Sequence, residues 1–105
     1  MKIEVLASYG MSKAMLSTAK QAIIKHFTHN LYMSGIEADR IGEDLEDVFG
    51  GLWAVYNYDI DYDIAYTIVR RSPSYVLFQV DDRGMLLARD GFPDPPEGGY
   101  NRPLI

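Results

Sequence analysis

The segment from residue 41 to residue 89 constrains the fold more than any other part of the sequence. Apolar residues at helical spacing, from Ile41 to Phe49, predict an amphipathic helix. This helix is expected to end at Gly50 and Gly51, because glycine adopts left-handed conformations at little cost. Runs rich in β-branched and aromatic residues start directly after the glycines. The pattern predicts a small sheet with helices packed on it.

Size and charge narrow the class of protein. The 105 residues are enough for one domain, and the hydrophobic fraction of 48% is enough for a core. The net charge of −5 argues against broad binding of nucleic acid or anionic membranes, which requires a basic surface. The sequence has no cysteine, which excludes disulfides and thiolate catalysis. Without a recognisable signal peptide or apolar span, the expected location is the cytoplasm.

Two helices are predicted in the first half of the chain. The first covers about residues 12–30 and is capped by Ser12, with its apolar stripe at Met15, Ala19, Ala22, Ile23, Phe27 and Leu31. The second covers about residues 35–49, and Ser34 and Glu37 have the spacing of a capping box at its start. Its apolar face is expected to hold Ala38, Ile41, Leu45, Val48 and Phe49, and its solvated face Glu43, Asp44, Glu46 and Asp47.

Five strands are predicted around these helices. They cover about residues 3–7, 52–58, 62–70, 74–80 and 84–89. A turn is expected at Arg71-Ser-Pro73 and a hairpin at Asp81-Asp-Arg-Gly84, with Gly84 as the residue of positive φ. The order β-α-α-β-β-β-β is an α+β fold, with two helices on a small antiparallel sheet. Residues 1–90 form the predicted domain, and the Pro- and Gly-rich residues 91–105 an extended or disordered tail.

Three aspartates, Asp59, Asp61 and Asp63, have the spacing that begins a calcium-binding loop. The rest of that loop is missing, because Ile64 stands where its glycine and Arg70 where its bidentate carboxylate would be. The alternation instead places the aspartates on one face of a strand. Such a face either repels edge-to-edge aggregation or attracts a basic partner.

The sequence contains no recognisable catalytic arrangement. His26 and His29 are three residues apart, but no third metal ligand stands at helical spacing, so both are expected on the helix surface. No nucleophile–base pair or phosphate-binding loop is apparent, so we expect neither an enzyme nor a cofactor. Trp53 is expected in the core. Four tyrosines follow it, namely Tyr56, Tyr58, Tyr62 and Tyr66. They are too many to bury together, so some of them should lie at an interface.

Five segments, in this order and spacing, resemble the dynein light chain family of small dimeric hub proteins. They are Gly10-Met-Ser-Lys-Ala-Met15, similar to the family's Asp-Met-Ser-x-x-Met; Ala19-Lys-Gln-Ala-Ile23, similar to its Ala-Thr-Gln-Ala-Leu; the spaced residues Ile41, Leu45, Phe49 and Trp53; Tyr75-Val-Leu-Phe78; and Met85-Leu-Leu-Ala88. The resemblance covers about residues 3–90 and leaves the tail unexplained.

The resemblance implies a strand-swapped homodimer in which the segment 60–66 crosses to the partner's sheet. That segment would then accept an extended partner peptide as an added strand. The start of the second helix lies where the family reads the partner's central polar residue. The implied partner-binding residues are Ile36, Glu37, Ile60, Asp61, Tyr62, Asp63, Ile64, Ala65 and Tyr66.

The departures from the family fall at this same place. Tyr58 and Tyr62 stand where the family has groove-floor glycines, and Tyr66 stands where it has threonine. These bulky side chains would fill the groove and exclude the usual partner motif. Ala54 replaces the histidine that makes family dimers pH-sensitive.

Two functions follow as expectations. The leading one is a dynein-light-chain-like, non-catalytic homodimeric adaptor in a cytoskeletal motor assembly on microtubules. Its partners would be proteins similar to dynein intermediate chains or other cytoskeletal proteins, with no nucleic acid or membrane. The alternative is an acidic monomeric inhibitor or regulator of a basic protein target, suggested by the net charge and the acidic run from Glu43 to Asp63.

Overall fold

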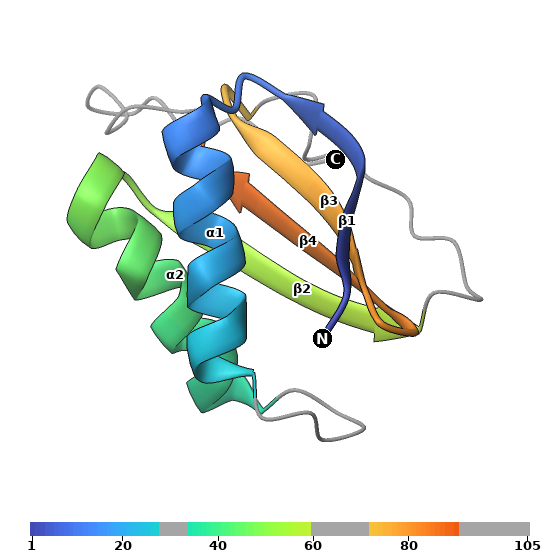
Figure 1. Ribbon diagram of the computed structural model, residues 1–105. Helices are drawn as coiled ribbons and strands as arrows, with labels where there is room; N and C mark the ends of the chain where they lie inside the picture. Colours follow the sequence, from blue (N-terminus) through green and yellow to red (C-terminus); the bar gives the residue numbers. More distant parts are fainter. Residues whose placement is uncertain (28–33, 60–71, 91–105) are drawn as a thin grey trace, which may run out of the picture.

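The computed structural model describes residues 1–27, 34–59 and 72–90. Two helices pack on one face of a four-stranded antiparallel sheet (Figure 1). The elements are β1 (Ile3–Tyr9), α1 (Lys13–His26), α2 (Gly35–Phe49), β2 (Trp53–Asp59), β3 (Tyr75–Val80) and β4 (Arg83–Arg89). The predicted α+β class and element order are confirmed. The strand expected at 62–70 and the tail at 91–105 lie outside the described residues.

The strands are arranged in the order β1-β3-β4-β2, so β3 and β4 are central and β1 and β2 are the edges. Alternate side chains of the central strands are buried against the helices; they are Val76, Phe78, Val80, Met85 and Leu87. Leu77 and Leu86 form a separate cluster on the opposite face. The central strands are therefore apolar on both faces, which matches their composition.

Helix α1 begins as the sequence predicts, because the Ser12 hydroxyl accepts a hydrogen bond from the Met15 backbone N–H (3.1 Å). Its buried residues are Met15, Ala19, Ala22 and Ile23. The prediction that it continues to residue 30 is wrong. The helix ends at His26 because Phe27 takes an extended conformation (φ −84°, ψ 116°), in which the Phe27 ring is buried in the core.

Helix α2 has the predicted capping box: the Glu37 N–H donates to the Ser34 hydroxyl (3.1 Å), and the Ser34 N–H donates to the Glu37 carboxylate (3.3 Å). The helix ends at Gly50, which has a φ of 72°, as the sequence indicates. The expectation that Val48 lies on the buried face is wrong. Val48 is 63% exposed and lines a groove between the outer surfaces of α1 and α2.

A polar contact joins the two helices. The Nε2 atom of His26 lies 2.9 Å from Asp44 Oδ2, and the His26 side chain is only 13% exposed. His26 is therefore a half-buried link between α1 and α2, not the free surface residue that its spacing suggested. The sequence could not reveal this contact because Asp44 is distant along the chain. His29 lies outside the described residues.

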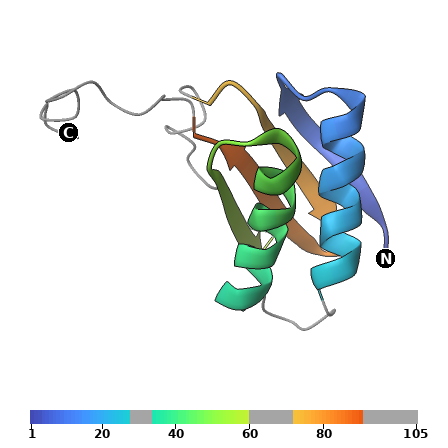
Figure 2. The ribbon, with the colours of Figure 1, turned by 90° about the vertical axis from the view of Figure 1, so that its left-hand side faces the viewer.

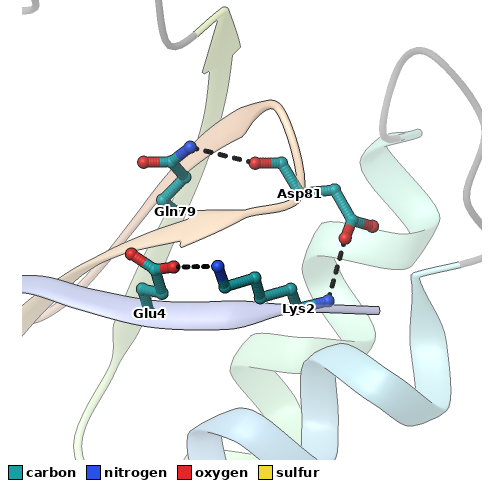
Figure 3. A network of polar contacts seen from close by, with 4 residues as sticks. All are labelled: Lys2, Glu4, Gln79 and Asp81. Atoms are coloured by element: carbon teal, nitrogen blue, oxygen red, sulfur yellow. Dashed lines mark hydrogen bonds and ion pairs between the residues drawn. The ribbon is translucent and has the colours of Figure 1, made fainter.

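The hairpin between β3 and β4 is tied to the start of β1 (Figure 3). The Lys2 N–H donates to Asp81 Oδ1, and the Asp81 N–H donates to the Lys2 carbonyl, both at 2.8 Å. Asp81 has a φ of 54°, so Asp81, not Gly84, is the turn residue of positive φ. The Gln79 side-chain amide donates to the Asp81 carbonyl (3.1 Å). On β1, the Glu4 carboxylate raises the pKa of the exposed Lys2 ammonium.

Candidate partner-binding groove

Strand β2 forms one edge of the four-stranded sheet. The Asp90 N–H donates to the Leu52 carbonyl (2.7 Å), so the Leu52 backbone faces β4. Alternation in an antiparallel pair then directs the backbone groups of Trp53, Val55 and Asn57 away from β4. Because the Trp53 N–H donates to Glu46, Val55 and Asn57 supply the outward-facing main-chain donors of this edge within the part of β2 that the structure describes.

A groove of about 350 Å³ lies between this edge and α2. It is lined by Ala38, Asp39, Gly42, Glu43, Glu46, Trp53, Ala54, Val55 and Tyr56, and we call it the α2–β2 groove. Figure 2 shows both helices in front of the sheet, with α2 on the side of β2. The groove therefore has one helical wall and one strand wall.

Small residues of α2 line the bottom of the α2–β2 groove and leave it deep. A side chain on Gly42 would place its Cβ 3.2 Å from the Trp53 carbonyl oxygen and 3.8 Å from a Val55 methyl group. The absence of a side chain at Gly42 allows α2 to approach the β2 backbone closely. Ala38, one turn earlier on α2, is also small.

Glu46 ties the two walls together at one end. Its Oε2 accepts a hydrogen bond from the Trp53 backbone N–H at 3.0 Å, and Glu46 is half-buried. The prediction that Glu46 lies on a solvated acidic face is therefore wrong. Trp53 is 7% exposed, which confirms its expected place in the core, and its indole N–H donates to the Gly50 carbonyl (3.1 Å). This end of β2 is therefore fixed relative to α2.

The remaining helical wall is acidic. Asp39 and Glu43 are exposed and stand four residues apart, so they are neighbours on the helix surface. Among the described residues, the ion pairs join Lys2 to Glu4 and His26 to Asp44, and neither involves these carboxylates. The groove thus has a negative wall whose charges no described cation balances.

The sheet face opposite the helices carries an aromatic cluster. Tyr58 and Tyr75 pack against Leu77 and Leu86 there. Tyr9 stacks on Tyr75 with ring centroids 6.1 Å apart, and it is 62% exposed. The expectation that some tyrosines lie at an interface remains a prediction, for which this face is a second candidate surface.

The structure describes only part of the predicted partner-binding set. Ile36 is 65% exposed in the first turn of α2, and Glu37 is engaged in the capping box. Both precede Ala38, the first residue of α2 that lines the groove. The predicted site residues Ile60, Asp61, Tyr62, Asp63, Ile64, Ala65 and Tyr66 lie outside the described residues.

Sequence reasoning missed Asp39 and Gly42, which line the groove itself. Their signal was present: small residues at 38 and 42 and acids at 39 and 43 each repeat at an interval of one helical turn. In the described ranges, no three His, Cys, Asp or Glu side chains form a cluster that could hold a metal ion. Neither described helix is long and apolar enough to cross a membrane.

Comparison with known structures identifies the fold. No protein-family model matches the sequence, and no curated protein matches it. The DLC-like domain of CsTAL3 matches in structure with a TM-score of 0.66 and 22% identity, over 81% of this chain and 88% of that one. The dynein light chain-like domain of the calcium-binding protein FhCaBP2 of Fasciola hepatica matches with a TM-score of 0.63 and 16% identity, over 83% and 90%. The chain, with two helices on a four-stranded antiparallel sheet, therefore has the fold of dynein light chain-like domains.

Proposed function

We propose that this chain is a non-catalytic, dynein-light-chain-like adaptor that forms a homodimer and binds extended protein segments by strand addition. The observation that carries the proposal is the edge strand β2 beside the α2–β2 groove, in a fold shared with dynein light chain-like domains. An edge strand supplies main-chain hydrogen bonds, and the adjacent groove supplies room for alternate side chains.

The dimer would form by exchange of the segment 60–66, which follows β2 directly in the sequence. The exchanged strand from a second copy would pair with β2 and protect its edge from aggregation, and the free edge of that exchanged strand would accept the partner segment. Ile36 and Glu37 at the start of α2 would then flank the bound partner. Two bound segments per dimer would join two partner chains, and the effective concentration of the second site would strengthen binding.

In a cell, the proposed partners are intermediate-chain-like or other cytoskeletal proteins of a cytoplasmic motor assembly on microtubules. The fold and the chemistry of the groove support the proposal that the partners are proteins. A basic surface or an apolar helix is not part of that support. We propose neither nucleic acid nor membrane as a ligand, because the chain carries a net charge of −5.

The molar mass in solution tests this function first. Light scattering over a dilution series is expected to give a persistent mass of about twice 11.9 kDa. A monomer at every concentration would contradict the exchanged dimer and remove the paired grooves.

The acidic surface favours a second candidate, a monomeric inhibitor of a basic protein. Glu43 and Asp47 are exposed on α2, and Asp82 is exposed in the β3–β4 turn. Binding by such a surface would weaken steeply as salt rises, because exposed charges are screened within about 10 Å at 0.1 M salt. Strand addition would depend on salt much less. A monomer with strongly salt-sensitive binding would therefore select this candidate.

A further inference from the structure

We propose that the proline-rich segment 91–105 docks on the sheet face opposite the helices, with its prolines against the rings of Tyr9 and Tyr75. Two features that the proposed function leaves unused support this inference. One is the set of tyrosines on that face, and the other is the composition of the segment that follows β4. The inference does not depend on strand exchange.

The register of the sheet shows which side chains share the face opposite the helices. Residues directly opposite each other in an antiparallel pair project to the same face. The row at one end of the sheet crosses all four strands and consists of Tyr9, Tyr75, Ala88 and Ala54. The next row consists of Ala7, Leu77, Leu86 and Tyr56. Small and aliphatic side chains therefore lie between the tyrosines of β1 and β3 and the tyrosine of β2.

The accessible part of this face is mainly aromatic. Leu77 and Leu86 are buried, whereas Tyr9 is 62% and Tyr56 is 44% exposed. Tyr9 stacks on Tyr75 with an angle of 22° between the ring planes. Stacked rings beside small side chains are a surface on which the polyproline II conformation binds, because that conformation is preformed and loses little entropy on docking.

The segment 91–105 has the matching composition. It holds four of the five prolines of the chain, and three of them lie within the four residues Pro93-Asp-Pro-Pro96. Proline fixes φ near the value of polyproline II and has no N–H to donate. Such a segment is poorly suited to extend a sheet at its edge. It is suited to pack its rings on the face of a sheet.

The segment starts at the end of the sheet where the tyrosines lie. Strand β4 ends at Arg89, and Ala88 is the cross-strand partner of Tyr75. The distance from β4 across β3 to β1 is two strand spacings, about 10 Å. Six residues in polyproline II extend about 19 Å, so residues 91–96 are long enough to reach Tyr9. The covalent link gives the segment a high effective concentration, which favours it over a free segment of similar sequence.

The proposed dimer leaves this site accessible. Strands β1 and β2 are opposite edges of the sheet. An exchanged strand that pairs with β2 extends the sheet in its own plane, so it does not cover Tyr9 and Tyr75 on β1 and β3.

A spin label on the full-length chain tests the contact. The sequence has no cysteine, so the substitution Gly99→Cys creates a single attachment site for a nitroxide. In nuclear magnetic resonance spectra, the label weakens the amide signals of the residues near it. We expect a greater loss of signal at Tyr9 and Tyr75 than at Gly51 and Leu52.

Gly51 and Leu52 are the internal reference because they lie near the point where the segment begins. The Asp90 N–H donates to the Leu52 carbonyl (2.7 Å), whereas Tyr9 is two strands away from β4. A segment without a preferred site would therefore weaken the signals of Gly51 and Leu52 at least as much as those of Tyr9.

Two variants of the labelled chain test the residues that make the contact. The triple variant Pro93→Ala, Pro95→Ala, Pro96→Ala should remove the excess loss at Tyr9, and it leaves every described residue unchanged. The variant Tyr9→Ala should remove the excess loss at Tyr75. The matched control is Ile24→Ala, which removes a similarly exposed apolar side chain from α1 and should leave the pattern intact.

Three results would overturn the inference. The first is an equal loss at Tyr9 and at the reference residues in the parent chain. The second is an excess loss at Tyr9 that persists in the proline variant. The third comes from a mixture of isotope-labelled chain without the spin label and unlabelled chain with it. A comparable loss at Tyr9 in that mixture would assign the contact to the segment of a second copy.

Discussion

Gly84 leaves room for a neighbouring aromatic ring on the sheet face opposite the helices. A Cβ at this position would lie 2.3 Å from the Tyr58 ring, which is closer than packed atoms can approach. The ring of Tyr58 therefore lies directly over Gly84, which is its cross-strand partner on β4. The sequence indicated a glycine with a special role in the hairpin, but the role is space for a neighbour, not a positive φ.

The substitution Gly84→Ala should lower the free energy of unfolding by about 1–3 kcal/mol, because the Tyr58 ring must move. Urea unfolding followed by circular dichroism measures this loss. In a Tyr58→Ala background, the same substitution should cost much less, because the obstructing ring is gone. An equal loss in both backgrounds would contradict the contact.

At the scale of elements, local signals predicted where helices begin and where α2 ends. Ser12, Ser34 and Gly50 act within a few residues of their own position, so their patterns are readable in the sequence. The end of α1 and the shape of the β3–β4 turn were not readable in the same way. Phe27 is buried in the core, and Asp81 hydrogen-bonds to Lys2, which is distant along the chain. Both features depend on contacts between distant residues.

The link between Lys2 and Asp81 gives a prediction for β1. The variant Asp81→Gly suits a φ of 54° but loses the carboxylate that accepts the Lys2 N–H. Amide exchange at the start of β1 should therefore become faster, while exchange in β4 changes little. Asp81→Asn keeps an acceptor and the same turn, so it is the matched control. Unchanged exchange in β1 for the glycine variant would show that the link does not hold the strand.

At the scale of the whole molecule, the fold could be predicted from the sequence more completely than the site. The class and order of the described helices and strands follow from local periodicity, and they were confirmed. In the described part of the predicted α1 stripe, Met15, Ala19, Ala22 and Ile23 are buried. The α2–β2 groove arises where two distant segments meet, which periodicity does not describe. Glu46 illustrates the difference: its spacing places it among solvated acids, yet it accepts a hydrogen bond from β2.

The substitution Tyr62→Gly tests the proposed route of partner binding. If the bulk at this position fills the family groove, the glycine variant should bind extended peptides at least about threefold more tightly, a gain of at least about 0.6 kcal/mol. Calorimetric titration with an extended peptide that the parent chain binds measures the change. Light scattering must first show that the variant keeps the mass of the parent chain. Unaltered affinity would mean that the groove is wrongly assigned.

The position of β1 at the far edge of the sheet has a consequence for the synthesis of the protein. Ile3 pairs with Val80, so the first strand to be made has its partner among the last residues of the domain. The helices can form and pack on each other while β1 is still without a neighbour. On a ribosome, β1 would therefore remain unpaired until β3 has been synthesised. The folding rate should then depend on this one closure of distant ends, and the lone strand would be the segment on which a chaperone has the longest time to act.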